Sequence, residues 1–224
     1  MGSKGTKTRI IETAVQLFNQ HGTSAVSTNH IADAAGLSPG NLYYHFRNKQ
    51  EIIRAILERM IGEMDGGWTP SVKPSLSHLN ERLQRVFGLL WDYRFFHREQ
   101  IALFQADAEL KKRYRTIHRQ RLAEIELFCQ GLVETGILRP FDDSTTLPAL
   151  IKIILLINDA WLPSLDMEDQ AINPQTIQEA INLMLQVMRP YMTTAALAEL
   201  PHLTALPNLT TPPSAIATHP QEQP

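Results

Sequence analysis

Apolar residues recur at helical spacing along most of this chain. In the segment 6–22 they form one stripe, made of Ile10, Ile11, Ala14, Val15, Leu17 and Phe18. Similar stripes predict helices over 51–65, 76–90, 99–106, 107–135 and 146–163, and from residue 174 to about 191. No stretch alternates apolar and polar residues with a period of two, so a sheet is not expected. The pattern predicts an all-α fold.

Residues 27–49, STNHIADAAGLSPGNLYYHFRNK, predict two short helices joined by a tight turn. Ser27 and Thr28 are of the type that caps the start of a helix, and Gly36 supplies the left-handed conformation that ends one. Ser38 and Pro39 then start a second helix at once, because a hydroxyl cap followed by proline suits a first turn. The segment is therefore a candidate helix-turn-helix.

The second short helix carries more exposed chemistry than its stability requires. Leu42 and Phe46, four residues apart, bury one side of it. The polar and aromatic residues left on its other sides are Asn41, Tyr43, Tyr44 and His45. Such a surface is typical of a recognition helix that lies in the major groove of DNA.

The run IADAAGLSPGNLYYHFRNKQEI, residues 31–52, resembles the DNA-binding domain of TetR/AcrR-type bacterial transcriptional regulators. A weaker likeness continues through WDYRFFHREQIALFQADAELKKRY, residues 91–114, and the Ile/Leu-rich segment near residue 155. The resemblance implies an N-terminal three-helix helix-turn-helix DNA-binding domain in residues 1–50, and a helical effector-binding and dimerisation domain in residues 51–192. The tail, residues 193–224, holds six of the 14 prolines and is expected to be disordered.

Positions in this motif assign roles within the DNA-binding domain. The residues expected to contact phosphate are Ser27, Thr28, Ser38, Tyr44 and Lys49. Those expected to face the groove are Asn29, Gly40, Asn41, Tyr43 and His45, and Pro39 completes the predicted site. An asparagine pairs through two hydrogen bonds with adenine in the major groove. Asn29 and His30 replace the long basic and acidic residues common there in the family, and Asn41 replaces a frequent threonine, so an unusual base preference is expected.

Charge supports DNA recognition once its distribution is considered. The whole chain has a formal net charge of −2. Residues 1–50 hold five basic and two acidic side chains, a net +3, whereas the remainder holds 16 basic and 21 acidic side chains, a net −5. The positive excess lies on the part that carries the motif, where it attracts a phosphate backbone.

Patterns typical of enzymes are missing from the sequence. It has no metal-ligand spacing, no Gly-rich phosphate loop and no GxSxG elbow. We therefore expect no catalysis, no cofactor and no bound metal. Its single cysteine, Cys129, is expected to be a small buried apolar residue. No apolar run is expected to cross a membrane, and the N-terminus lacks the apolar core of a signal peptide. A soluble cytoplasmic protein is predicted.

Residues 87–104 concentrate aromatic side chains with arginine and histidine between them, a mixture that favours a small-molecule pocket. Together with residues further along the chain, the candidates for contacting an effector are Trp91, Arg94, Phe95, His97, Phe104, Tyr114, His118 and Trp161. For any one of these aromatic residues, filling the core of a helical bundle is the better interpretation. For the region as a whole a cavity is expected, chiefly because of the resemblance.

Two segments near the C-terminus bear on assembly. ALIKIILLINDAW, residues 149–161, is apolar nearly all round, which predicts a buried helix, with a buried strand as the alternative. The segment from 174 to 191 carries one apolar stripe. In TetR-like proteins the last two helices of each subunit pair into a four-helix dimer interface. The resemblance therefore implies a homodimer that binds a pseudo-palindromic operator in double-stranded DNA.

The function expected from these features is a DNA-binding regulator. Repression is the family default, with release of the operator when a small-molecule effector binds the C-terminal domain. The alternative is a DNA-binding scaffold that is regulated by a protein partner and has no small-molecule pocket.

Overall fold

The computed structural model describes residues 3–65, 72–171 and 173–200, and the regular structure within these ranges is helical. The helices are α1 (Ser3–Ala25), α2 (Thr28–Ala34), α3 (Pro39–His45), α4 (Lys49–Met64), α5 (Leu76–Asp92), α6 (Arg94–Ala106), α7 (Ala108–Glu134), α8 (Thr146–Met167), α9 (Pro174–Met188), the 3-10 helix η1 (Arg189–Tyr191) and α10 (Thr194–Glu199). The all-α prediction is confirmed.

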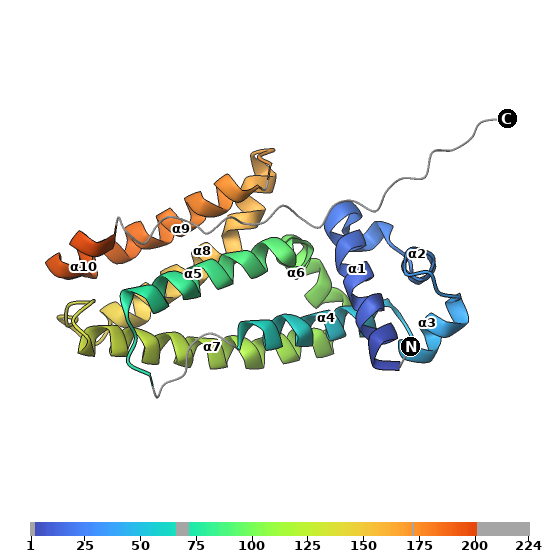
Figure 1. Ribbon diagram of the computed structural model, residues 1–224, viewed down its shortest axis with the longest axis horizontal. Coiled ribbons are helices and arrows are strands. Elements are labelled where there is room, and N and C mark those ends of the chain that lie inside the picture. Colours follow the sequence, from blue (N-terminus) through green and yellow to red (C-terminus); the bar gives the residue numbers. More distant parts are fainter. Residues whose placement is uncertain (1–2, 66–71, 172, 201–224) are drawn as a thin grey trace.

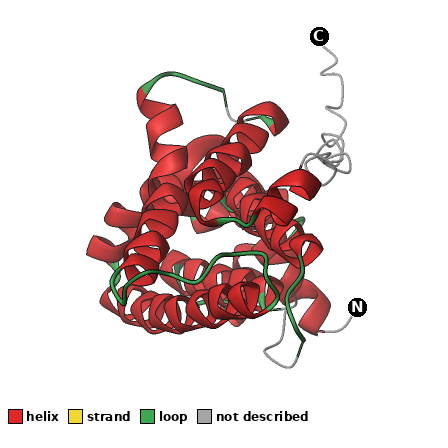
Figure 2. Ribbon diagram, turned by 90° about the vertical axis from the view of Figure 1, so that its left-hand side faces the viewer, coloured by secondary structure: helices red, strands yellow, loops and turns green. Residues whose placement is uncertain are grey.

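The molecule is elongated, and α1–α3 form one end of it (Figure 1). α4 leaves this end and runs alongside α7, while α5, α8 and α9 complete the larger part. Seen from the opposite end, the longer helices pack as a bundle (Figure 2). α4 is therefore the helix that leads from the small end into the bundle.

Local sequence signals set several helix boundaries. Ser75 and Asn173 cap α5 and α9 by accepting hydrogen bonds from backbone N–H groups of the first turn. The helix of α1 is interrupted at its predicted end, residue 22, where Gly22 has a left-handed φ of 76°, and a short helical turn to Ala25 follows this kink. α6 starts at Arg94 and not at the predicted residue 99, because it follows α5 with only one residue between them.

The buried apolar side chains form two clusters whose boundary does not coincide with residue 50. The first cluster joins α1–α4 to the end of α5, to α6 and to the first half of α7, and includes Phe18, Ile31, Leu42, Ile56, Phe95 and Phe96. The second joins α5, the second half of α7, α8, α9 and α10, and includes Leu83, Phe87, Phe128, Leu132, Ile181 and Met184. The three N-terminal helices thus share a core with α6.

The apolar segment 149–161 is helical and lies within α8. α8 packs against α6, α7 and α9, but Ile153 and Leu156 on it remain 45% and 58% exposed in this single chain. Within the described ranges, α8 is the one helix long and apolar enough to span a membrane by length and composition, contrary to the prediction that no run is long enough. This is weak evidence for a membrane, because a core helix of a soluble protein meets the same criterion.

The tail predicted to be disordered from residue 193 begins with ordered structure. Thr193 caps α10, and its backbone N–H donates to the carbonyl oxygen of Ile137 at 3.0 Å. Ala196 is 5% exposed and belongs to the second cluster. The prediction is therefore wrong for residues 193–200, where a capped turn docks an apolar residue on the bundle. Residues 201–224 lie outside the described residues.

Candidate nucleic-acid interface and internal cavity

The caps and the turn of the helix-turn-helix have the predicted geometry. Ser27 Oγ accepts a hydrogen bond from the backbone N–H of His30 at 3.2 Å, and His30 Nδ1 accepts one from the N–H of Ser27 at 3.3 Å. Ser38 Oγ accepts from the N–H of Asn41 at 3.2 Å. Gly36 lies between the helices with a φ of 63°. Short-range hydrogen bonds therefore define both helix starts.

The inner side of α3 fixes how the helix is presented. Leu42 is fully buried and Phe46 is 3% exposed, and both belong to the first cluster. Lys7 Nζ lies 5.3 Å from the centroid of the Phe46 ring. The hydroxyl oxygens of Thr28 and Tyr43 are 3.0 Å apart and form a hydrogen bond between α2 and α3. The outer side of α3 is thus held in one orientation relative to α2.

Most of the predicted DNA-contacting residues lie on the outer surface of α2 and α3. The exposed ones are Ser27, Asn29, Ser38, Pro39, Gly40, Asn41, Tyr43 and Tyr44, while Thr28, His45 and Lys49 are half-buried. Tyr44 is 81% exposed, and its ring meets His45 edge-on with the centroids 5.1 Å apart. Large aromatic residues this exposed contribute little to the core, so a binding surface explains them better than stability does.

Gly40 is not required by the fold itself. A Cβ atom built at this position meets no atom within 4 Å, and the backbone does not adopt the left-handed conformation that favours glycine. The missing side chain leaves free space on the outer surface of α3. That space allows a bound partner to approach the backbone closely.

Lys49 takes a role that the sequence does not predict. Its ammonium group donates to the carbonyl oxygens of Thr23 at 2.5 Å and Val26 at 3.0 Å, and so ties the start of α4 to the α1–α2 junction. An ammonium has three donors. The predicted phosphate contact by Lys49 stays a prediction, and it relies on the one N–H donor that is not bonded to Thr23 or Val26.

α6 is bonded directly to the end of α1. The carboxylate of Glu99 accepts two hydrogen bonds from the backbone N–H of Thr23, at 3.0 and 3.2 Å, and one from the Thr23 hydroxyl. Asn19 Nδ2 donates to the carbonyl oxygen of Asp92 at 2.7 Å, and Asn19 Oδ1 accepts from the N–H of Phe95 at 3.1 Å. These hydrogen bonds tie the end of α1 directly to the α5–α6 corner.

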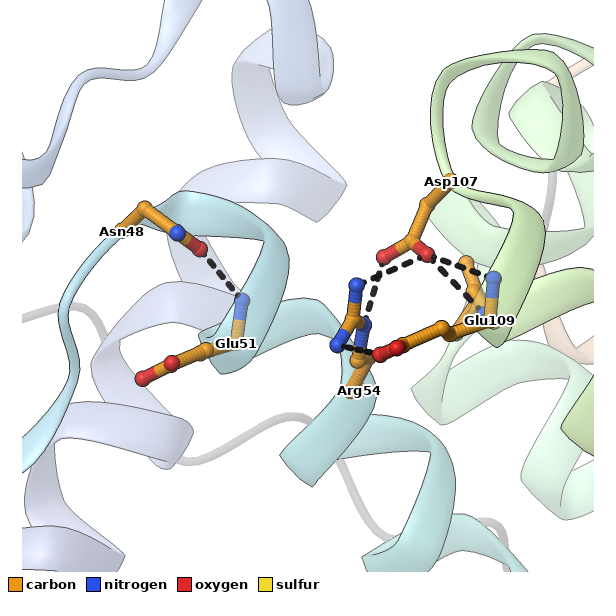
Figure 3. Close-up of polar contacts among 6 residues, drawn as sticks. Asn48, Glu51, Arg54, Asp107 and Glu109 are labelled. Atoms are coloured by element: carbon orange, nitrogen blue, oxygen red, sulfur yellow. Dashed lines mark hydrogen bonds and ion pairs between the residues drawn. The ribbon is translucent and has the colours of Figure 1, made fainter.

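A second link joins α4 to the corner between α6 and α7 (Figure 3). Arg54 Nε and Nη2 donate to the two carboxylate oxygens of Asp107 at 2.7 and 2.9 Å, and Nη1 pairs with Glu109. Asp107 Oδ1 also accepts from the backbone N–H groups of Glu109 and Leu110, both at 3.0 Å. Burial raises the pKa of Asp107, but the bonds from Arg54 and these N–H groups outweigh it and hold the pKa below its usual value. One carboxylate thus caps α7 and holds α4.

An internal cavity of about 150 Å³ lies where the two hydrophobic clusters meet. From the first cluster it is lined by Leu57, Met60, Leu89 and Ile117, and from the second by Leu79, Leu83, Leu90, Phe128, Cys129, Met184 and Met188. Together with Met64, three of these residues give the wall four methionines. Methionine side chains are unbranched and adapt to ligands of different shape. The wall is therefore both apolar and deformable.

Three of the eight residues predicted to contact an effector line this cavity, namely His97, Tyr114 and His118. Burial lowers the pKa of His97 to about 4, so the ring is neutral near pH 7. Burial also raises the pKa of the Tyr114 hydroxyl well above its usual value. This part of the cavity thus favours uncharged, hydrogen-bonding groups.

The other five predicted effector residues, Trp91, Arg94, Phe95, Phe104 and Trp161, do not line the cavity. Phe95 is 1% exposed in the first cluster. The guanidinium of Arg94 lies over the ring of Trp91 at 4.9 Å, and Phe104 packs on Tyr114 with ring centroids 4.9 Å apart. Trp161 packs against the second cluster. Large rings fill the space between helices, so these side chains serve the packing of the core and do not form the cavity wall.

The sequence analysis missed four polar residues of the cavity wall, Arg82, Arg121, Asn158 and Asp159. Three of them carried a signal. Arg82 falls on the apolar stripe of α5, three residues after Leu79, and Asn158 and Asp159 interrupt the otherwise apolar segment 149–161. A polar residue on the buried face of an amphipathic helix indicates that its side chain meets a polar partner or a cavity in the interior.

Two models of known protein families match this chain. Residues 10–56 match the model described as bacterial regulatory proteins, tetR family. Residues 49–200, more than half of the chain, match the TetR model described as bacterial transcriptional repressor. The chain belongs to the TetR family. The resemblance found in residues 31–52 is confirmed, and the protein is a DNA-binding transcriptional regulator.

The relatives of this TetR-family chain described below are regulators, and their similarity extends over most of the chain. A TetR-family transcriptional regulator from Marinobacter aquaeolei VT8 superimposes with a TM-score of 0.81 and 30% identity, covering 91% of this chain and 98% of that one. The uncharacterized HTH-type transcriptional regulator YhgD of Bacillus subtilis is 26% identical over 72% of this chain and 88% of its own length. The HTH-type transcriptional repressor KstR2 of Mycobacterium tuberculosis is 26% identical over 68% of this chain and 78% of its own length.

The two TetR-family matches correspond to the two candidate sites. All the predicted DNA-contacting residues fall within 10–56, and the residues that line the cavity fall within 49–200. The matches overlap over 49–56, which is the first half of α4. This half of α4 carries Lys49 and Arg54, the residues that bond it to the α1–α2 junction and to Asp107. α4 therefore belongs to both parts of the protein.

Proposed function

We propose that this protein is a repressor that binds a pseudo-palindromic DNA operator as a homodimer and releases it when a small molecule enters the cavity. The observation that carries the proposal is the position of the cavity between two hydrophobic clusters. One cluster contains the helix-turn-helix and the other contains α8 and α9. A ligand at this boundary acts on both.

Contact with DNA is assigned to the outer surface of α2 and α3. Asn29, Asn41 and Tyr43 are exposed there, and Gly40 leaves room for the edge of a base pair. Asparagine side chains read adenine in the major groove, at about 1–3 kcal/mol per good pair. A dimer doubles these contacts by placing two recognition helices on half-sites about 34 Å apart.

Dimerisation is assigned to the apolar surface of α8 and α9. Ile153 and Leu156 on α8 and Leu183 on α9 are 45%, 58% and 41% exposed in the single chain. The two helices that carry these residues pack against each other. An apolar surface of this kind is explained by a second copy of the chain that covers it.

Leu156→Asp is expected to convert the dimer into monomers. Burial of a leucine stabilises an interface by about 1.5 kcal/mol or more, and in a two-fold dimer the change occurs twice, so the dimer dissociation constant is expected to rise about a hundredfold. Sedimentation equilibrium measures it. Leu127→Asp is the matched control, since Leu127 is an exposed leucine on α7 at 49%. Equal association of both variants and the wild type would assign the dimer to another surface.

Release is assigned to displacement of α4. An effector in the cavity contacts Leu57 and Met60 on one side and Met184 and Met188 on the other. The start of α4 is bonded to the α1–α2 junction through Lys49, so a shift of α4 changes the tilt of the helix-turn-helix. In a dimer this alters the separation of the two recognition helices and removes one of them from its groove. Among relatives of the same fold, KstR2 is described as a ketosteroid transcriptional regulator, which supports a small-molecule effector.

Selection of bound DNA from a random pool tests the proposal. The wild type is expected to enrich an inverted repeat, and the double variant Asn41→Ala/Tyr43→Ala is expected to enrich nothing, because both side chains project from the outer surface of α3. An enriched single half-site would contradict the dimer. Enrichment of the same sequence by the double variant would show that α3 does not read the bases. A metabolite screen against the enriched operator then separates effector release from regulation by a protein partner.

A further inference from the structure

Arg82 is the unusual residue of the cavity wall. Within the described part of the chain it forms no hydrogen bond and no ion pair, and its one specific contact is with the ring of Phe128, whose centroid lies 5.1 Å from the guanidinium carbon. Arg121, which lines the same cavity, is bonded to both Asp65 and Glu124. Of these two cavity arginines, only Arg82 lacks a carboxylate partner.

An unpaired arginine next to apolar residues is costly to the free protein. The guanidinium stays protonated at any physiological pH, so it cannot lose its charge as a buried lysine or histidine does. Burial lowers the pKa of Arg82, and repulsion by Arg121 lowers the pKa further. Attraction by Glu124, and to a smaller extent by Cys129, raises the pKa and opposes this effect. An anion bound at Arg82 relieves this cost, and the planar guanidinium matches a carboxylate with two parallel hydrogen bonds.

The remainder of the cavity specifies what the anion is attached to. Apart from Arg82, Arg121 and the polar residues near His118, the wall is mainly aliphatic and methionine-rich, so the body of the ligand is apolar. His118 lies ten residues before Phe128 on α7, a distance of about 15 Å along a helix, so the polar wall residues near His118 form the opposite end. The cavity of about 150 Å³ admits a short chain or a single ring, and movement of the methionines admits more.

The opposite end rejects a second negative charge. Asp159 lines it without an ion pair in the described residues, and its Oδ1 accepts only a weak hydrogen bond from Asn158 at 3.2 Å. His97 Nδ1 and Asn158 Oδ1 are buried there without a partner in the part of the chain that the structure describes. The Asp159 carboxylate repels an anion, whereas the neutral His97 and Asn158 offer hydrogen bonds to uncharged groups, so the ligand has one orientation, with its anionic group at Arg82.

We propose that the effector is a monoanionic amphipathic molecule, a carboxylate with an apolar body, whose carboxylate binds Arg82. This inference rests on the proposed function, because it assigns the chemical class of the ligand for that same cavity. The ligand carries a single charge and lies along α7 from Phe128 towards His118.

Calorimetric titration of the full-length protein with three probes of equal chain length tests this inference. Octanoate, 1-octanol and octylammonium share one apolar body and differ in the charge of the head group. Octanoate is expected to bind at least about tenfold more tightly than 1-octanol, which is the effect of one charge-assisted hydrogen-bonded pair. Arg82→Gln is expected to remove this difference and to leave 1-octanol binding unchanged, which also shows that the variant folds.

Arg85→Gln is the matched control, because Arg85 lies on the same helix, is exposed and does not line the cavity. It is expected to keep the preference for octanoate. Equal affinity for octanoate and 1-octanol, or tightest binding of octylammonium that is lost in Asp159→Asn, overturns the inference and leaves the proposed function standing. Failure of all three probes to bind also overturns the inference, whereas the proposed function is tested separately by the selection of bound DNA and the metabolite screen.

Discussion

Gly40→Leu is expected to lower the affinity of the protein for its operator about a thousandfold while leaving the fold at least as stable as before. The position is exposed in the unbound protein and a Cβ atom added there meets no atom within 4 Å, so the fold leaves room for a larger side chain. Against DNA the same side chain occupies the space that a base pair needs. A steric conflict costs about 1–3 kcal/mol, and a dimer on two half-sites meets it twice.

The sign of the stability change distinguishes this interpretation from simple damage. Gly40 is the second residue of α3, and replacing a helical glycine stabilises a helix by up to about 1 kcal/mol. Gly62→Leu is the matched control, because Gly62 is also helical, exposed and free of neighbours within 4 Å, but lies on α4. Operator affinity is measured by fluorescence anisotropy and stability by urea unfolding at one protein concentration. An unchanged operator affinity would exclude the outer surface of α3 from the interface.

Asp107→Ala is expected to destabilise the protein by about 2–3 kcal/mol. The substitution removes the cap of α7, worth about 1 kcal/mol, and the two hydrogen bonds from Arg54. The contribution of Arg54 is at the low end for a charged pair, because its side chain is 39% exposed and solvent screens it. Asp107→Asn keeps an acceptor for the cap and is expected to lose only about half as much. Equal losses in both variants would assign the effect to the ion pair alone.

The pH dependence separates the two roles of Asp107 further. Its pKa is lower in the folded protein than in the unfolded chain, so its carboxylate stabilises the fold fully above the unfolded pKa of about 3.9. That stabilisation is lost as the pH falls through the folded pKa. The difference in unfolding free energy between wild type and Asp107→Asn is therefore expected to be constant from pH 7 to about 5 and to shrink at lower pH. A difference that grows on acidification would contradict the direction of the pKa shift.

The helix-turn-helix was predictable because its signals are local. Ser27, Gly36 and Ser38 act on backbone groups within a few residues of themselves, and they fill these roles in the structure. Leu42 and Phe46 were predictable from their spacing alone, and both are buried. Cys129 is buried as predicted, and burial raises the pKa of its thiol to about 11.

The cavity was not predictable in the same way. Its wall combines α4, α5, α6, α7, α8 and α9, and the first and last of its residues are more than a hundred positions apart in the chain. The aromatic concentration at 87–104 indicated the right region and His97, but not the other residues, since Phe95 and Phe104 fill the core around Phe96. Periodicity identifies the buried face of each helix and says nothing about which faces meet or where they leave a gap.

The sequence by itself determined the helices, the capped turn and the outward surface of α3, because each depends on interactions within one or two helical turns. Only the tertiary structure decided that Lys49 bonds the start of α4 to the α1–α2 junction, that Asp107 joins α4 to α7, and that Arg82 lies unpaired in a cavity. These contacts join residues that are 23 or more positions apart along the chain. They exist only because the helices pack at particular distances and angles, which no local pattern encodes.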